Sequence, residues 1–205
     1  FSQAWSISAI KEFDKNDTDH FIGNTYTMVN FALTMICSII MICNILIAKI
    51  LYSNDFFVAW QYVPPLLMSV LFNAMSLFIG SIFTAVKDTK TLSISTVIGA
   101  AINIVCNFVF IYFWDIYGAV FATMIGYAVV LLVRHVILRK HIIMKIKWRR
   151  DLFVYFLLGL QMVFALFGWR YILLQIVIFA VIGIFYKAEI KNGINLIVQK
   201  VIGEK

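Results

Sequence analysis

Long runs of uncharged, mostly apolar residues alternate with short polar segments along this chain. The clearest pair is residues 66–86 and residues 91–114, which carry no charged side chain and are joined by Lys87-Asp88-Thr89-Lys90. A helix needs about 20 residues, at a rise of 1.5 Å each, to cross a hydrocarbon core about 30 Å thick. Because no water is present at that depth, the backbone must satisfy its own hydrogen bonds, as a helix does. The pattern therefore predicts a transmembrane helical hairpin.

The same pattern predicts about six spans along the chain. Aromatic residues around Asp55 predict a short interfacial helix at 51–63, and Pro64-Pro65 then begin the next span, where a missing amide donor costs least. A narrow apolar stripe in residues 187–205 predicts an amphipathic helix on the cytoplasmic membrane surface. The predicted spans are residues 26–48, 66–86, 91–113, 118–138, 152–168 and 171–186.

The composition agrees with this membrane class. The chain is 63% hydrophobic and 13% charged, about half the charged fraction of a typical soluble domain. No soluble domain of useful size fits between the apolar runs. The predicted fold class is all-α, a polytopic integral membrane protein. Because the first residue is Phe1 and the start is too polar and short for a signal peptide, we expect the C-terminal part of a longer protein.

The distribution of lysine and arginine predicts the orientation of the spans. With six spans, all but two of the 17 basic residues fall on one side, and the exceptions are Lys49 and Arg170. The basic side of a membrane protein is normally cytoplasmic, which places the 87–90 hinge, the 139–150 loop and the tail inside. The basic residues are spread along loop ends and form no nucleic-acid reader module, so we expect no nucleic-acid partner.

Two helix faces carry uncharged polar side chains. Ser69, Asn73 and Ser76 share one face of the 66–86 span, and Asn103 and Asn107 share one face of the next. An unpartnered amide in hydrocarbon costs on the order of 2–7 kcal/mol, so these faces must meet another helix or water. Residue types alone favour hydrogen bonding between helices. The alternative is a hydrated substrate cavity, whose neutral donors and acceptors suit sugar hydroxyls.

Other polar and small residues inside the spans predict packing. Small residues at intervals of four, as in Gly118, Ala122 and Gly126, allow two helix backbones to approach closely. Arg134 and His135 lie about one turn before a helix end and are expected to reach the interface by snorkelling. Single polar residues in apolar runs are expected to make contacts between helices: Asn30, Asn44, Gln161 and Gln175.

No motif for catalysis is present. The chain shows no nucleophile elbow, Walker loop, metal-ligand cluster or paired catalytic carboxylates. Its cysteines, Cys37, Cys43 and Cys106, lie inside apolar runs at spacings that match no zinc or redox motif. No acidic residue lies inside a predicted span. We therefore expect no enzyme activity, no catalytic residue, no cofactor and no metal site.

Several segments of the chain resemble the C-terminal half of bacterial polysaccharide flippases. These are the Wzx-type O-antigen and capsule repeat-unit transporters, of the same superfamily as MATE drug exporters and lipid II flippases. The proline pair, the Thr-Lys pair, the asparagines and the Gly-Ala positions give the resemblance its weight. The segments are Gln3-Ala4-Trp5-Ser6-Ile7-Ser8-Ala9-Ile10, Trp60-Gln61-Tyr62-Val63-Pro64-Pro65-Leu66-Leu67, Leu77-Phe78-Ile79-Gly80-Ser81-Ile82-Phe83-Thr84-Ala85, Lys87-Asp88-Thr89-Lys90-Thr91, Gly99-Ala100-Ala101-Ile102-Asn103-Ile104-Val105-Cys106-Asn107-Phe108 and Tyr117-Gly118-Ala119-Val120-Phe121-Ala122-Thr123.

The resemblance implies a larger protein of two pseudo-symmetric lobes with a central cavity that opens alternately to each side. It implies flipping of a polyprenyl diphosphate-linked oligosaccharide across the bacterial cytoplasmic membrane, with membrane lipids and a missing N-terminal lobe as partners. On that map, residues 1–24 end a truncated helix and a cytoplasmic loop, and residues 25–138 form four helices of the second lobe. Residues 139–150 are a basic loop, residues 151–186 an added helix pair, and residues 187–205 the tail.

Two alternatives stay open. The first is a MATE-like drug or cation exporter, which a cavity carboxylate in the missing half would favour. The second is a membrane assembly protein without transport, whose polar faces would be sealed against neighbouring helices. An anionic diphosphate should also need a buried cation, and the spans of residues 26–113 contain none at mid-depth.

Overall fold

The computed structural model describes residues 2–11, 13–14, 17–18, 20–140, 142, 146–187 and 189. Every regular element in those ranges is a helix, which confirms the predicted all-α class. The elements are α1 (Ser2–Lys11), α2 (Phe21–Leu51), η1 (Asn54–Gln61), α3 (Val63–Ala85), α4 (Thr89–Leu138), α5 (Trp148–Leu166), η2 (Gly168–Tyr171) and α6 (Ile172–Phe185), where η is a 3-10 helix.

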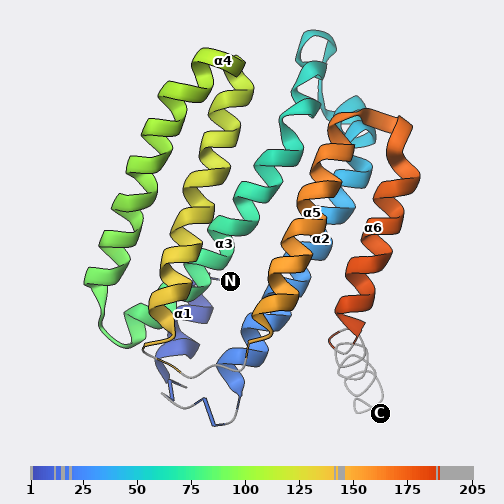
Figure 1. Ribbon diagram of the computed structural model, residues 1–205. Coiled ribbons are helices and arrows are strands. Elements are labelled where there is room, and N and C mark those ends of the chain that lie inside the picture. Colours follow the sequence, from blue (N-terminus) through green and yellow to red (C-terminus); the bar gives the residue numbers. More distant parts are fainter. Residues whose placement is uncertain are drawn as a thin grey trace.

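The long element α4 is a hairpin of two antiparallel legs (Figure 1). The backbone reverses at Asp115, whose φ of 47° and ψ of −126° are not helical. At Gly118 an added Cβ would lie 2.2 Å from the carbonyl oxygen of Phe110, so only glycine fits this tight reversal. The two spans predicted for residues 91–113 and 118–138 are therefore the two legs of α4.

Among the described residues, four helical segments are long and apolar enough to cross a membrane: α2, α3, α4, and α6 together with η2. The 19-residue α5 is not among them, because its first turn carries Arg149, Arg150 and Asp151. Counting both legs of α4 and α5, the described residues supply the six predicted segments. This is the architecture of a polytopic membrane protein.

The connections between helices gather at the two ends of the bundle (Figure 1). The α3–α4 connection, the start of α2 and the end of α6 lie at the lower end. The 3-10 helices η1 and η2 and the α4 turn lie at the upper end. The polar segments predicted to share one side of the membrane therefore share one end, while the assignment of that end to the cytoplasm stays a prediction.

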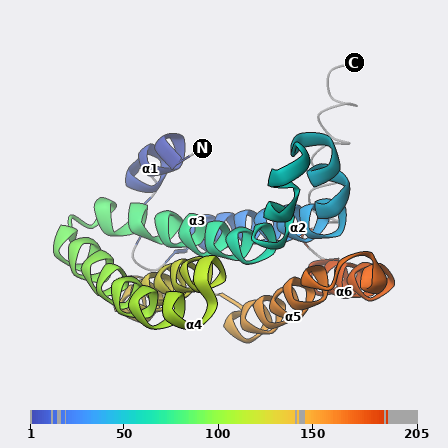
Figure 2. The ribbon, with the colours of Figure 1, turned by 90° about the horizontal axis from the view of Figure 1, so that it is seen from above.

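The central helix is α3, which contacts α1, α2, α4 and α5 (Figure 2). Trp5 of α1 stacks on Phe78 of α3, with ring centroids 4.2 Å apart, and its indole nitrogen donates to the Phe78 carbonyl at 3.2 Å. The short helix predicted at residues 51–63 is present as the 3-10 helix η1, and its position at the membrane interface stays a prediction. The predicted surface helix of residues 187–205 lies, apart from Lys187 and Glu189, outside the described residues.

Candidate functional site

The polar face predicted on α3 is mostly turned inward. Ser69 and Ser76 are 3% and 2% exposed. Ser69 Oγ donates to the Leu66 carbonyl at 2.7 Å, and Ser76 Oγ donates to the Asn73 carbonyl at 2.8 Å. Serine hydroxyls that bond back to their own helix need neither water nor a second helix as partner. Asn73, between them, is half-buried and is the most accessible of the three.

The two asparagines of the first α4 leg bond to each other. The Asn107 amide nitrogen donates to the Asn103 side-chain oxygen at 3.0 Å and to the Asn103 carbonyl at 2.8 Å. The second leg passes close by, since a Cβ added to Gly126 would lie 3.0 Å from Asn103 Cβ. The predicted close helix packing at Gly126 is confirmed. The structure thus places Asn103 against the second leg of α4.

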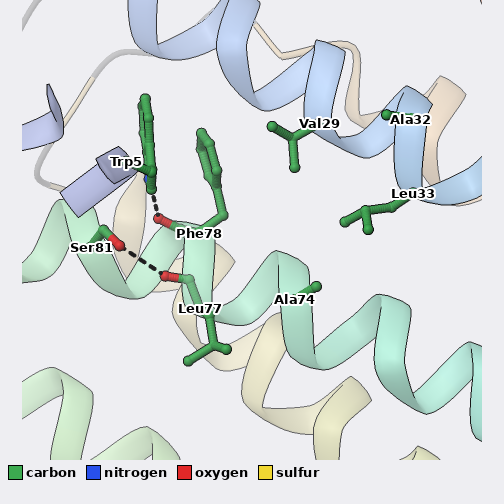
Figure 3. Close-up of a pocket in the computed structure, with 8 residues that line it drawn as sticks. All are labelled: Trp5, Val29, Ala32, Leu33, Ala74, Leu77, Phe78 and Ser81. Atoms are coloured by element: carbon green, nitrogen blue, oxygen red, sulfur yellow. Dashed lines mark hydrogen bonds between the residues drawn. The ribbon is translucent and has the colours of Figure 1, made fainter. Parts of the chain in front are cut away.

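A cavity of about 400 Å³ lies between α1, α2 and α3 (Figure 3). Its walls are apolar, and the one hydroxyl that lines it, on Ser81, donates to the Leu77 carbonyl of its own helix. None of the five predicted cavity residues lines this space. Walls of this kind can accommodate hydrocarbon but offer little to sugar hydroxyls. The lining residues are Trp5, Val29, Ala32, Leu33, Ala74, Leu77, Phe78 and Ser81.

Arg134 joins α3 to both legs of α4. Side chains of a helix lean toward its N-terminus, so Arg134, near the end of the second leg, reaches toward the middle of the bundle. Its Nε donates to Ser95 Oγ at 3.0 Å, one terminal nitrogen donates to the Ser76 carbonyl at 2.7 Å, and the other donates to Thr96 Oγ1 at 3.0 Å. The side chain is 6% exposed. The expectation that Arg134 snorkels to the interface is therefore wrong.

The charge of Arg134 is met by neutral oxygens. Among the described residues, no carboxylate pairs with it. Gly80 makes room for the guanidinium, because an added Cβ there would lie 3.0 Å from a terminal nitrogen of Arg134. A guanidinium has five N–H donors, so donors remain for a further acceptor. Arg134 is a buried cation that was not anticipated at this depth.

A second polar cluster lies between α2, α5 and the end of α6. Asn30 of α2 donates from its amide nitrogen to the Tyr186 hydroxyl at 3.2 Å and accepts from the Tyr155 hydroxyl at 2.8 Å. Two turns along α2, Ser38 donates to Gln161 Oε1 at 2.6 Å. We call these five residues the polar seam. All but Tyr155 are fully buried, and Tyr155 is partly buried.

The seam confirms the predicted interhelical contacts of Asn30 and Gln161. Asn44 instead donates from its amide to the Trp60 carbonyl in η1, at 2.8 Å. Gln175 is 3% exposed, and its side-chain oxygen has no partner among the described residues. His135 also does not reach an interface: it is 3% exposed and stacks on Trp148, with ring centroids 4.0 Å apart.

An acidic residue lies at the lower end of the seam. Asp151 is 0% exposed, and its Oδ1 accepts from both Nε and a terminal nitrogen of Arg150, each at 3.1 Å. Arg150 is also ion-paired with Glu189. The other carboxylate oxygen, Asp151 Oδ2, has no hydrogen-bond partner in the part of the chain that the structure describes. The helix predicted to begin at Leu152 begins at Trp148, which places Asp151 inside it.

The family model described as "Polysaccharide biosynthesis protein" matches residues 4–199, nearly the whole chain. The chain belongs to this family. Neither a curated protein nor a solved structure matches it.

Membership in the polysaccharide biosynthesis protein family gives the chain a role in polysaccharide synthesis or transport. Together with the apolar helices, it identifies a membrane protein. Members of this family are typically transporters rather than enzymes. Among the described residues, no group of three or more histidines, cysteines or acidic residues is placed to hold a metal ion.

Sequence reasoning did not predict that Arg134 and Asp151 are buried. The burial of Arg134 could have been inferred from Ser95 and Thr96, because these residues lie on the first leg of α4 and their hydroxyls can accept hydrogen bonds from a buried guanidinium. A signal for Asp151 was its spacing of four from Tyr155, which puts both on one helix face. A stripe on α2 at intervals of four could have indicated the opposing face: Tyr26, Asn30, Thr34 and Ser38.

Proposed function

We propose that the chain is part of a transporter that flips a lipid-linked oligosaccharide repeat unit across the bacterial cytoplasmic membrane. The product would be a surface polysaccharide such as O-antigen, capsule or exopolysaccharide. The observation that carries the proposal is the family match over residues 4–199, on a bundle of antiparallel apolar helices. The partners would be a polyprenyl diphosphate-linked oligosaccharide, membrane lipids and the N-terminal lobe of the same protein.

The buried cation supports the anionic substrate. A diphosphate in a low-dielectric site needs a positive partner, because an unpaired buried charge is very costly. Arg134 is buried, has only neutral partners among the described residues and keeps free N–H donors. Arginine matches phosphate oxygens with its planar fork of donors. A MATE-like exporter of cations would instead need a carboxylate facing its substrate.

Alternating access requires that helices move as rigid groups. Arg134 fastens α3 to the α4 hairpin, and Gly99 and Gly126 let the two legs pack closely, since a Cβ on Gly126 would lie 3.3 Å from the Gly99 carbonyl oxygen. These contacts support a rigid unit of α3 and α4 within the second lobe. Asn73, half-buried on α3, is then the best placed of the five proposed cavity residues to meet a sugar headgroup.

One observation favours the alternative of an assembly protein without transport. Ser69 and Ser76 bond to their own helix, and Asn103 and Asn107 bond to each other against Gly126. Polar faces closed in this way need no substrate. The two functions are separated by a flipping assay.

The test uses the purified protein that contains this chain, reconstituted in liposomes with a fluorescent short-chain polyprenyl diphosphate sugar. We expect the labelled lipid to cross the bilayer at least tenfold faster than in protein-free liposomes. A fluorescent cationic drug and the same lipid without its diphosphate are the controls. Transport of the drug but not the sugar lipid would support the exporter, and transport of neither would support the assembly protein.

A further inference from the structure

The acidic end of the polar seam has features that neither packing nor the proposed substrate explains. Asp151 is fully buried in the first turn of α5, and only one of its two carboxylate oxygens is hydrogen-bonded. A buried ionised carboxylate with an unsatisfied oxygen is costly, and protonation removes much of that cost. The site therefore admits two forms, a charged carboxylate that is paired with Arg150 and a neutral acid that needs no ion pair.

The titratable and charged groups that face Asp151 come from α5, from α2 and from the end of α6. Arg150 and Tyr155 belong to α5, Tyr26 belongs to α2, and Tyr186 and Glu189 lie at and beyond the end of α6. Burial and the negative charge of Glu189 oppose the charged carboxylate, while Arg150, the one cation among these described groups, favours it. Burial and then the charge of Asp151 raise the pKa of Tyr186 above its ordinary value, so this hydroxyl keeps its proton.

Exposure increases stepwise from Asp151 outward. The side chain of Asp151 is 0% exposed, that of its partner Arg150 is 9% exposed, and that of Glu189 is 16% exposed. This ion-paired row leads from the buried carboxylate to the lower end of the bundle, the predicted cytoplasmic side. A small separation of Arg150 from Asp151 would therefore open Asp151 to water without unpacking the seam.

We infer that Asp151 is a reversible proton-binding site that couples proton movement to transport. A proton from water binds Asp151 Oδ2, the carboxylate becomes a neutral acid, and Arg150 loses its charged partner. The contact between α5 and α2 through the seam then weakens or shifts. Tyr155 lies on the same face of α5 as Asp151, and its hydroxyl donates to Asn30 of α2. The coupling role rests on the proposed transport function, whereas proton binding itself does not.

Infrared difference spectroscopy tests proton binding without any substrate. The purified protein is titrated, and the carbonyl stretching band of a protonated carboxylic acid is followed with pH. We expect a band from a buried acid that is absent in Asp151→Asn and unchanged in Asp115→Asn. Asp115 is the matched control because it is an exposed carboxylate at the α4 turn. A band unaltered by Asp151→Asn would overturn the assignment.

The coupling step is tested in the liposome assay with an imposed pH gradient. We expect the gradient to stimulate flipping by the wild-type protein and by Asp115→Asn about tenfold. The Asp151→Asn protein should flip the lipid at the rate measured without a gradient, whether or not a gradient is imposed. The coupling would be overturned if the gradient still stimulated Asp151→Asn, or if it failed to stimulate a wild-type protein that flips the lipid. If the wild-type protein flipped no lipid at all, the proposed function would be overturned instead.

A second variant covers the case in which Asp151→Asn fails to fold. Arg150→Gln removes the guanidinium whose charge and two hydrogen bonds favour the charged carboxylate. Without that cation the neutral acid persists to higher pH. The midpoint of the infrared titration should therefore move to higher pH, and a midpoint that stays the same or falls would contradict the assignment.

Discussion

Arg134 donates a hydrogen bond of 2.7 Å to the backbone carbonyl of Ser76, thirteen residues into the 23-residue helix α3. The carbonyl of a helix residue is normally occupied by the amide four residues on, so this oxygen accepts a second bond from a charged donor. Together with Ser95 and Thr96, it turns one arginine into a link between three helical segments.

Removal of this link is expected to cost more than the loss of one surface charge. Hydrogen bonds to charged groups contribute about 1.5–3 kcal/mol each. Arg134→Gln should therefore lower the thermal midpoint and the folded yield in membranes. Arg170→Gln is the matched control, since Arg170 is exposed in η2, and should leave both unchanged. Thermal unfolding of the detergent-solubilised variants measures the difference.

A role for Arg134 in substrate binding is separated from its structural role by Arg134→Lys. Lysine keeps the charge but lacks the planar fork of donors. If Arg134 binds the diphosphate, this variant should lose transport by about tenfold more than its loss of folded protein explains. Export that falls only in step with folded yield would leave Arg134 as a structural link alone.

Close packing of the α4 legs makes Gly126 intolerant of bulk. An added Cβ already lies 3.0 Å from Asn103 Cβ, so Gly126→Leu should push the legs apart at a cost of about 1–3 kcal/mol. The matched control is Gly159→Leu in α5, where an added Cβ meets nothing within 4 Å. Folded yield in membranes should fall for the first and stay for the second. Equal yields would refute the packing argument.

The sequence predicted the helices well because their signal is local. An uncharged run of about 20 residues has few alternatives in a bilayer, and even the two legs of α4 were separated correctly at Asp115. Partners across the bundle carry no such local signal. Arg134 was expected at the interface because its position near a helix end allows snorkelling. Its hydrogen bonds to Ser76, Ser95 and Thr96, in the space left by Gly80, hold it inside instead.

In the candidate site, too, the sequence predicted local features but not the partners of the polar side chains. Ser69 and Ser76 were correctly expected to avoid lipid, but the sequence could not specify that their hydroxyls would bond to their own helix. Asp151 was placed outside a span because charges usually end one. The helix α5 begins at Trp148, and the ion pair of Arg150 with Glu189, 39 residues away, is invisible in the hydropathy pattern.

The orientation of the bundle is tested by cysteine labelling in a cysteine-free background. Three exposed positions report on the two ends: Ser53 directly precedes η1 at the upper end, Thr89 begins α4 at the lower end, and Lys140 follows the end of α4. Because the basic segments are predicted to be cytoplasmic, a membrane-impermeant thiol reagent should label Ser53→Cys in intact cells and miss Thr89→Cys and Lys140→Cys. Labelling of Lys140→Cys from outside would reverse the orientation.

The proposed sugar path is tested at Asn73 and Asn103, which the structure places differently. Asn73 is half-buried and its side chain makes no hydrogen bond that the described residues record, whereas Asn103 is bonded to Asn107 and packs on Gly126. Loss of a cavity amide leaves water to satisfy its partner, so transport falls while stability changes little. Loss of the Asn103 amide removes one of the two acceptors of the Asn107 amide nitrogen and the packing on Gly126, so stability falls by about 1 kcal/mol.

We therefore expect Asn73→Ala to accumulate normally and to reduce surface polysaccharide severalfold in a flippase-null strain. Asn103→Ala should lose folded protein, and Asn103→Trp should lose more, because the bulky ring would overpack the α4 hairpin. Immunoblots of membrane protein, measured beside polysaccharide export, separate the two effects. Full export from Asn73→Ala, Asn103→Ala and Asn103→Trp would remove the cavity assignment for both residues, and loss of export without loss of protein in Asn103→Trp would instead place Asn103 on the path.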